Sequence, residues 1–322
     1  MGQLRVAVGL SGGVDSAVSA WLLKKRGFDV VGVYMNNWDH IEEGVSSCPR
    51  TKDEADARYV CEKLRIPFTI VNFVKEYWNE VFTKMLENYR RARTVVPDVI
   101  CNREIKFERL HNYAIDELGA DLIATGHYAS TSFDPQITTH CGDSAEGVKL
   151  LCSADPLKDQ TPFLCTLQQK QLRRAMFPVG SLTKTQVRQI AREQGLASVA
   201  DKAESMGICF VGKRKDFDSF IDQCEGSYHP CLYATAFCVL EPQWIDENPL
   251  SGNDVVTLEC RIQRTHVPIR CEVQRLGQSC LTVRPVFPLR AVADGQMCVF
   301  YRGRECLGGG EVQYVISTLN SK

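Results

Sequence analysis

Residues 4–27 read LRVAVGLSGGVDSAVSAWLLKKRG, and the order of elements in this stretch decides the fold. The apolar run LRVAVGL predicts a buried strand, and apolar residues at helical spacing from Val14 predict a helix that Gly27 ends. A short glycine-bearing loop joins the two. Because the amides and the dipole of a helix N-terminus attract anions, this arrangement predicts a phosphate site.

The loop SGGVDS, residues 11–16, fits neither of the two common phosphate-binding patterns. It lacks the lysine of a Walker loop, and it lacks the spaced glycines of the dinucleotide pattern. It offers instead the hydroxyls of Ser11 and Ser16 and the carboxylate of Asp15, which suits a magnesium ion held against phosphate oxygens. The alternative is a purely structural turn in which Asp15 is a first-turn helix acid.

The alternation of strand and helix continues along the chain. Strands are predicted over 30–36, 67–73 and 120–129, and helices over 53–64, 76–92, 105–119 and 181–195. Such alternation builds a parallel sheet with helices on both faces, and ligands bind at the carboxyl ends of its strands. The glycine loop, Met35 and the segment GHYA at 126–129 are therefore expected on one rim of the sheet.

The C-terminal part of the chain has a different pattern. Short alternating strands from about Thr257 predict a small β domain of the barrel type, and residues 137–152 predict a loop with a hairpin. The helix over 181–195 has a capping box at Thr183 and Gln186 and a stop at Gly195. We expect domains at 1–224 and 254–322, with residues 225–253 as a truncated central region or linker.

Composition and charge set broad limits. The formal net charge is -1 and 44% of the 322 residues are hydrophobic, so a nucleic-acid partner would have to meet a local basic patch. The 15 cysteines would suit a disulfide scaffold only in a small secreted domain, and we expect no signal peptide ahead of this chain. We therefore expect a reducing compartment and no membrane partner.

Two of the cysteines stand in chemically distinctive surroundings. No C-x-x-C pair occurs, which argues against a zinc ribbon and the usual iron-sulfur spacing, and cysteines such as Cys61 and Cys260 look like apolar fillers. Cys101 is expected just ahead of a helix start, and Cys209 lies near Lys202, Lys213 and Arg214. Helix N-termini and cations both lower the pKa of a thiol, so these two are the candidate reactive cysteines.

Taken together, several motifs resemble one family, the tRNA-specific 2-thiouridylases. They are GLSGGVDSAV, YMNNWD, VNFVKEYWNEVF, PDVICNREIKF, LGADLIATGHYA, DPLKDQTPFL and ESMGICFVGKR, and the resemblance covers residues 3–224 and the C-terminal stretch RAVADGQMCVFYRGRECLGGGEV. The resemblance implies an α/β fold, with a parallel-sheet pyrophosphate-loop domain followed by a smaller C-terminal β-barrel. The wording of ESMG and FVGKR is closer to the animal mitochondrial members, which implies a mitochondrial location.

The resemblance also implies a reaction. ATP, with Mg²⁺, adenylates O2 of the wobble uridine of Lys-, Glu- and Gln-type tRNAs, and a cysteine persulfide then delivers sulfur to C2. Cys209 would carry the persulfide, which a sulfur-carrier protein or a cysteine desulfurase supplies. Cys101 would be the partner thiol, able to close a disulfide with Cys209. Asp15 would act with them at the ATP loop.

The resemblance further assigns binding residues. ATP would contact Gly9, Leu10, Ser11, Gly12, Gly13, Val14, Asp15, Ser16, Met35 and Gly126. The tRNA would contact Val96, Pro97, Asp98, His127, Lys158, Asp159, Gln160 and Gln296. From the residues alone, His127 could be only a satisfied histidine at a strand end, and Lys158–Gln160 are expected to form a solvated loop.

Two departures from the family pattern stand out. The family's RTPNPD reads RTVVPD here, so Val95 and Val96 replace a proline and an asparagine, and a hydrogen-bonding amide is lost from the base pocket. After residue 227 we expect most of the family's central domain to be absent, as in a splice form or incomplete gene model, so weaker tRNA binding is expected. The alternatives are another pyrophosphate-loop adenylating enzyme, such as argininosuccinate synthase or an amidotransferase-linked synthetase, and a catalytically silent tRNA or ATP binder.

Overall fold

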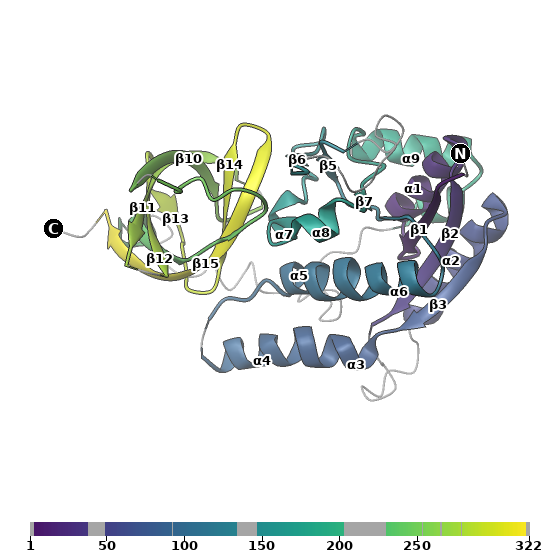
Figure 1. Cartoon of the computed structure of the whole chain (residues 1–322), viewed down its shortest axis with the longest axis horizontal. Helices are drawn as coiled ribbons and strands as arrows, with labels where there is room; N and C mark the ends of the chain where they lie inside the picture. Colours follow the sequence, from purple (N-terminus) through teal and green to yellow (C-terminus); the bar gives the residue numbers. More distant parts are fainter. Residues whose placement is uncertain are drawn as a thin grey trace.

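The protein has an α/β domain and a β-barrel domain, drawn at opposite ends of the molecule in Figure 1. This computed structural model describes residues 3–37, 49–91, 93–133, 147–202, 230–252, 254–264, 266–277 and 279–319. The predicted persulfide cysteine, Cys209, lies outside the described residues. None of the helices in these ranges combines the length and the apolar character needed to cross a membrane.

A five-stranded parallel sheet forms the centre of the α/β domain, in the order β3-β2-β1-β4-β7. Its strands are β1 (Arg5–Leu10), β2 (Asp29–Asn36), β3 (Phe68–Asn72), β4 (Leu122–Ala124) and β7 (Ala175–Met176). Leu10 pairs with Tyr34, and Val8 pairs with Ala124, so the strand ends reach a common edge. The predicted parallel sheet is confirmed.

Helices cover both faces of this sheet, and each face has its own apolar core (Figure 1). On one face lie α1 (Val14–Lys25), α2 (Pro49–Leu64), α9 (Lys184–Glu193) and α10 (Ala197–Ala200). On the other lie two longer helical stretches. One joins α3 (Val74–Tyr77), π-helical η2 (Trp78–Phe82) and α4 (Thr83–Arg90), and the other joins α5 (Pro97–Ile100), π-helical η3 (Cys101–Arg109) and α6 (Leu110–Asp116).

Local sequence signals explain several helix ends. Thr183 caps α9 by accepting from the amide of Gln186, whose side chain returns to the Thr183 amide, as the capping box predicted. Gly195 adopts a φ of +71°, the left-handed conformation that ends a helix at low cost for glycine. The expectation that Cys101 precedes a helix start was wrong. Pro97 begins the helix, and Cys101 lies one turn inside it.

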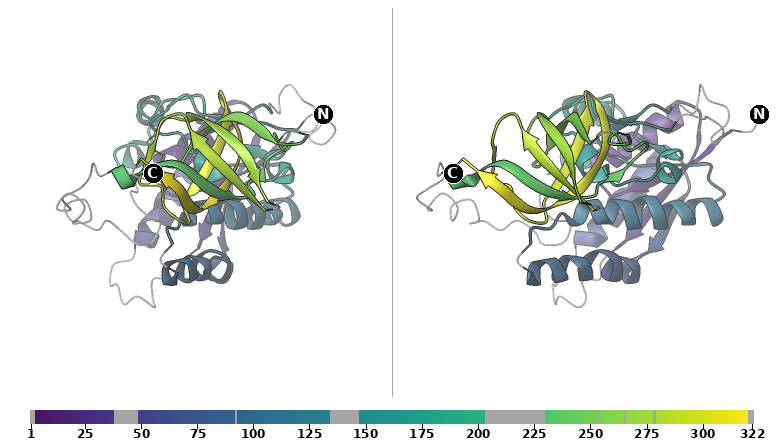
Figure 2. Two further views of the ribbon diagram at one scale, coloured as in Figure 1. Left: turned by 90° about the vertical axis from the view of Figure 1, so that its left-hand side faces the viewer. Right: turned by 60° about the vertical axis from the view of Figure 1, so that its left-hand side comes forward.

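Six antiparallel strands close the C-terminal barrel. In order around it they are β8 (Tyr233–Leu240), β12 (Cys280–Pro285), β11 (Ile269–Leu276), β10 (Val255–Arg261), β14 (Met297–Arg302) and β15 (Glu305–Thr318), and β15 pairs back with β8. Short β9 (Gln243–Trp244), β13 (Leu289–Arg290) and η4 (Pro230–Leu232) flank them. Figure 2 shows the strands curving round to close. Residues 233–244, expected ahead of the barrel, thus belong to its sheet.

Strands from the two domains pair with one another in a single β-sheet. The hairpin of β5 (Ala129–Thr131) and β6 (Leu150–Cys152) lies in the α/β part of the sequence, yet β6 pairs with β15 of the barrel. Short helices α7 (Thr161–Leu164) and α8 (Gln169–Leu172) follow the hairpin. Gly309 of β15 lies so close to Cys165 that an added Cβ would come within 2.7 Å of its sulfur. The domains are therefore packed together at backbone level.

Candidate active site

Glycines and serines determine the conformation of the pyrophosphate loop, residues 11–16, which joins β1 to α1. Gly12 has a φ of +72°, and a Cβ there would lie 2.4 Å from the Asp53 carbonyl oxygen, so only glycine fits without a shift. The buried Ser16 hydroxyl donates to the Gly13 carbonyl and accepts from the amide of Ser11 at 3.2 Å. Ser16 therefore shapes the loop, while Ser11 stays exposed at its tip.

Two side chains from distant parts of the sequence hold Asp15. The Lys184 ammonium lies 2.7 and 2.8 Å from the two Asp15 carboxylate oxygens, and the Tyr128 hydroxyl donates to one of them at 2.8 Å. Lys184 is the first residue of α9, and its ammonium also lies 5.8 Å from the centre of the Tyr128 ring. A lysine from another helix thus lies beside the loop, with its ammonium paired to Asp15.

The remaining predicted ATP residues converge on the same rim. A Cβ added to Gly126 would lie 2.6 Å from the Ser16 amide nitrogen, and one added to Gly9 would lie 3.5 Å from the Met35 methyl carbon. The structure therefore brings Gly9, Met35 and Gly126 together around the start of α1. These close approaches explain glycine at 126, where the backbone conformation itself makes no demand for it.

Lys202 is a second cation beside the loop that the ATP prediction did not include. Its ammonium donates to the Gly12 carbonyl at 3.1 Å and to Asp53 and Asp56 at 2.6 and 2.7 Å. Burial alone would lower the pKa of Lys202, but the hydrogen bonds to the two carboxylates raise it above the ordinary value. Lys202 stays charged and ties its segment of chain to the loop.

Cys101 is buried in the apolar core on the sheet face opposite α1. It is 5% exposed and belongs to the same apolar core as Ile105 and Phe107 of η3. Its neighbour Asn102 donates to the Phe163 carbonyl at 2.9 Å, which fixes the helix against α7. The described residues thus place one of the two predicted reactive thiols in a firmly packed helix.

Val96, one of the three predicted base-contacting residues, lines a pocket between the domains. Pro97 is buried at the first position of α5, Asp98 is half-buried in its first turn, and Val96 precedes them. The pocket is small and lies beside Val96. Its lining includes Thr94, Val95, Val96, Val99 and Ile100 from the α/β domain and Gly295, Met297 and Glu311 from the barrel. The valines give this pocket a largely apolar wall.

His127 is buried and neutral. Its ring packs between Phe107 and Phe177, and its Nδ1 lies 2.8 Å from the Thr125 hydroxyl. Burial lowers the pKa of His127 well below its ordinary value, and nearby Lys106 lowers it further. The arrangement matches the alternative of a satisfied core histidine, and it gives His127 no charge to offer an RNA phosphate.

The loop carrying Lys158, Asp159 and Gln160 is firmly bonded within the protein. Asp159 is 3% exposed, and its carboxylate accepts from Arg261 of the barrel at 2.9 Å. The Gln160 side chain accepts from the Tyr128 amide at 2.9 Å. Lys158 is half-buried. The expectation of a solvated loop was wrong for Asp159, whose carboxylate is turned inward.

Gln296 lies at the tight turn before β14. Its side chain accepts from the Ala293 amide at 3.0 Å, and its backbone amide donates to the Ala293 carbonyl at 3.2 Å. Gly295 next to it has a φ of +84°, and a Cβ there would lie 2.1 Å from the Thr94 carbonyl oxygen. The turn therefore sits directly against the segment that leads into α5.

The loop is not a metal cage by itself. Both oxygens of Asp15 are bonded within the protein, and the described residues contain no group of three or more potential ligands from His, Cys, Asp and Glu. A magnesium ion prefers several oxygen ligands and keeps bound waters, so the donor set fits phosphate better than a resident cation. Lys184 would have to move before Asp15 could bind Mg²⁺.

The fold and the site define the class of protein: a pyrophosphate-loop domain that uses ATP, joined to a β-barrel. Residues 4–213 match the family model described as the HUP domain of tRNA methyl transferase, and residues 234–312 match that of the aminomethyltransferase β-barrel domain. The chain belongs to the tRNA-specific 2-thiouridylase family, as its relatives show.

Three curated relatives illustrate the match. A probable mitochondrial tRNA-specific 2-thiouridylase of Caenorhabditis elegans is 48% identical, over 98% of this chain and all of the relative. The human mitochondrial tRNA-specific 2-thiouridylase is 37% identical, over 95% and 90%. A bacterial tRNA-specific 2-thiouridylase from Lysinibacillus sphaericus is 36% identical, over 98% and 96%.

The relatives are longer in the aligned region. The alignment with the Caenorhabditis elegans protein spans 379 positions, whereas this chain has 322 residues, so at least 57 of those positions have no residue here. The two family-model matches are separated only by residues 214–233. That most of a central domain is missing from this sequence stays a prediction.

Proposed function

We propose that this chain converts a tRNA uridine into 2-thiouridine at the expense of ATP. The observation that carries the proposal is the site around Asp15, where a helix N-terminus, a glycine-rich loop and the Lys184 ammonium gather at one sheet rim. This combination suits a triphosphate whose α-phosphorus must stay open to attack. Membership of the 2-thiouridylase family supports the same reaction.

The first chemical step activates an oxygen that otherwise leaves poorly. The uridine O2 attacks the α-phosphorus of ATP, pyrophosphate leaves, and the base carries AMP on that oxygen. Lys184 and the amides at the start of α1 would hold the phosphates, as cations and helix N-termini do. Magnesium would enter with ATP, bound to its phosphate oxygens.

The second step replaces oxygen by sulfur. The terminal sulfur of a persulfide on Cys209 attacks C2, and the adenylated oxygen leaves as AMP. The Cys101 thiolate then attacks the Cys209 sulfur, which frees the thiocarbonyl and leaves a disulfide for a reductant to reopen. Cys101, buried in a packed helix, would be the fixed partner in this exchange.

The finer assignments extend this proposal. Val96, Pro97 and Asp98 beside the domain pocket would face the target base, with Lys158, Gln160 and Gln296 nearer the tRNA backbone. The sulfur donor would be a carrier protein or desulfurase, the substrates Lys-, Glu- and Gln-type tRNAs, and the compartment the mitochondrion. The domains would span 1–224 and 254–322 with a shortened middle, whose residues 233–244 pair into the barrel sheet. These points rest on the family resemblance.

The description of the family that matches residues 4–213 names a different reaction, methyl transfer. Methylation would leave the ATP loop and the pair of thiols without a role. Another pyrophosphate-loop adenylation would use the loop but not the thiols. The 2-thiouridylase reaction is the candidate that uses the loop, Lys184 and both cysteines.

The test is to incubate the whole chain with ATP, Mg²⁺, a persulfide donor and tRNA bearing a wobble uridine, and to measure 2-thiouridine by mass spectrometry. We expect ATP-dependent 2-thiouridine that is lost with Cys209→Ser and kept with Cys280→Ser, a half-exposed barrel cysteine. Full turnover of ATP by the Cys209→Ser variant would favour another adenylating enzyme. Pyrophosphate release without thiolation would favour a silent binder.

A further inference from the structure

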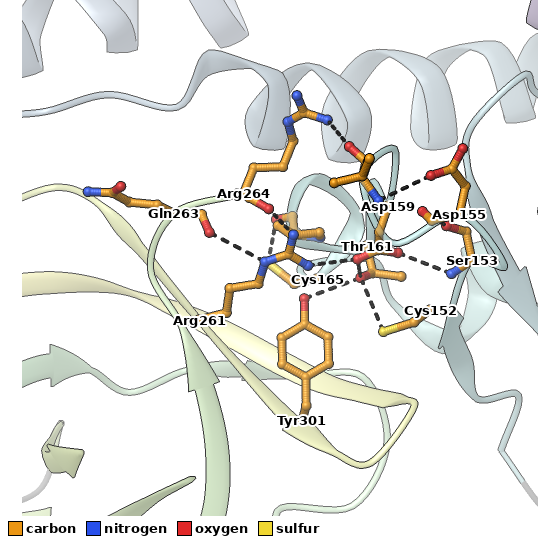
Figure 3. Close-up of polar contacts among 12 residues, drawn as sticks. Cys152, Ser153, Asp155, Asp159, Thr161, Cys165, Arg261, Gln263, Arg264 and Tyr301 are labelled. Carbon is orange, nitrogen blue, oxygen red and sulfur yellow. Dashed lines mark hydrogen bonds and ion pairs between the residues drawn. The ribbon is translucent and has the colours of Figure 1, made fainter. Parts of the chain in front are cut away.

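A buried ion pair joins the barrel to the loop 155–160. Arg261, at the end of β10, donates to Asp159 at 2.9 Å, and the two side chains are only 6% and 4% exposed. The same carboxylate accepts from the Thr161 hydroxyl at 2.8 Å and from the Ser153 amide at 3.1 Å. Figure 3 shows these partners converging on Asp159 from both domains.

The arginine is itself held in one orientation by the barrel. Its guanidinium donates to the Gln263 carbonyl at 3.4 Å and to the Arg264 carbonyl, which are in the turn that follows β10 (Figure 3). Tyr301 of β14 lies 3.2 Å from the Thr161 hydroxyl. Arg264 adds a bond to the Leu157 carbonyl at 3.2 Å. The barrel therefore fixes several points of the loop.

Two series of hydrogen bonds connect the loop 155–160 to the ATP site. In the first, Gln160, next to Asp159, exchanges hydrogen bonds with the Tyr128 backbone at 2.8 and 2.9 Å, and the Tyr128 hydroxyl donates to Asp15. In the second, the Asp155 carboxylate accepts from the Lys184 amide at 3.0 Å, and the Lys184 ammonium contacts Asp15. The two residues whose side chains hold Asp15 are thus bonded to this loop through their backbones.

We propose that Arg261 is a positioning residue for the ATP site, and that the barrel sets the geometry of Asp15 through the loop 155–160. This proposal rests on the proposed use of ATP, and it adds a role for the barrel in ATP binding. A buried ion pair gains little free energy over an apolar contact of equal volume, because both charges lose water. What it supplies here is a fixed orientation for the loop.

Because Arg261→Met alone would leave Asp159 charged and unpaired, the test variant is Arg261→Met with Asp159→Asn, which removes both charges together. The control is Lys149→Met with Glu305→Gln. It removes another ion pair between the domains, 3.2 Å long, that joins β15 to the residue before β6 and makes no bond to the loop 155–160. Thermal unfolding establishes a temperature at which all chains are folded.

At that temperature, ATP affinity is measured by calorimetry without tRNA. We expect the Arg261 and Asp159 double variant to bind ATP about tenfold more weakly, Arg261→Lys to recover part of the affinity, and the control to stay near wild type. A folded double variant with unchanged affinity overturns the proposal. An equal loss in the control also overturns it, because any damage to the interface would then suffice.

Hydrogen exchange provides a readout that does not depend on ATP. The amides of Tyr128 and Lys184 donate to Gln160 and Asp155, so both should exchange faster in the double variant and not in the control. Unchanged exchange overturns the positioning link. A wild-type chain that fails to bind ATP, while these amides respond as expected, contradicts the proposed function and supports the link.

Discussion

Replacing Gly126 by alanine should damage the ATP site without straining the backbone. The Cβ would lie 2.6 Å from the Ser16 amide nitrogen and 2.8 Å from the Asp15 carbonyl carbon. The shorter separation is roughly 0.8 Å inside ordinary van der Waals contact. Because both contacted atoms belong to the backbone, either the start of α1 or the segment that carries Gly126 must move. Movement of α1 misaligns the amides that would face phosphate.

The magnitude follows from overpacking in a rigid region, which costs about 1–3 kcal/mol. If about 1.4 kcal/mol of this falls on the ATP-bound state, affinity drops roughly tenfold. Gly119→Ala is the matched control, because Gly119 has a φ of +59° and open space around it. Its expected cost is about 1 kcal/mol of folding stability from the left-handed conformation, with no effect on ATP.

Denaturant unfolding measures stability, and calorimetry measures ATP affinity, for wild type and both variants. The expected pattern is a stability loss in each variant and an affinity loss in Gly126→Ala alone. Wild-type affinity in Gly126→Ala would refute the close approach of the rim to α1. Comparable affinity loss in Gly119→Ala would show that ATP binding follows global stability and not this contact.

Three further predictions concern charge and burial. Lys184→Met should weaken ATP binding by about tenfold or more, and Lys184→Arg should retain more affinity than Lys184→Met, as titration calorimetry would show. Burial lowers the pKa of His127, so between that pKa and about 6.5 the unfolded chain binds the extra proton. Stability should fall below pH about 6.5 by up to ~1.4 kcal/mol per pH unit, and His127→Gln should remove that component from pH-dependent denaturant curves. Burial raises the pKa of Cys61 and Cys165 to about 12, so alkylation of the native chain at pH 8 should spare both and label half-exposed Cys280, as peptide mass spectrometry would reveal.

Local patterns in the sequence were sufficient for the architecture. The strand, loop and helix at the N-terminus are confirmed, as are the parallel sheet, the capping box at Thr183 and the C-terminal barrel. Each depends on residues close together in sequence, where spacing determines structure. One local signal was missed: Pro97 followed by Asp98 is a helix start, with proline at the first position and an acid in the first turn.

Contacts between distant residues could not be predicted in this way. Lys184 and Tyr128 meet Asp15 across separations of 169 and 113 residues, and no pattern in either segment indicates the other. The pairing of Asp159 with Arg261 likewise needs the barrel to be folded beside the α/β domain. An aspartate in a segment rich in polar residues looks exposed until its partner is known.

The pairing of β15 with β6 holds the two parts of the chain together independently of the peptide that connects them. The strand pairing and the Arg261 ion pair join residues on either side of positions 203–229, so the two halves should adhere even when the peptide connection between them is cut. A chain nicked in that interval by a protease should elute as one particle and separate only under denaturing conditions. Evolution or splicing could therefore shorten the interval while these two halves keep their mutual docking.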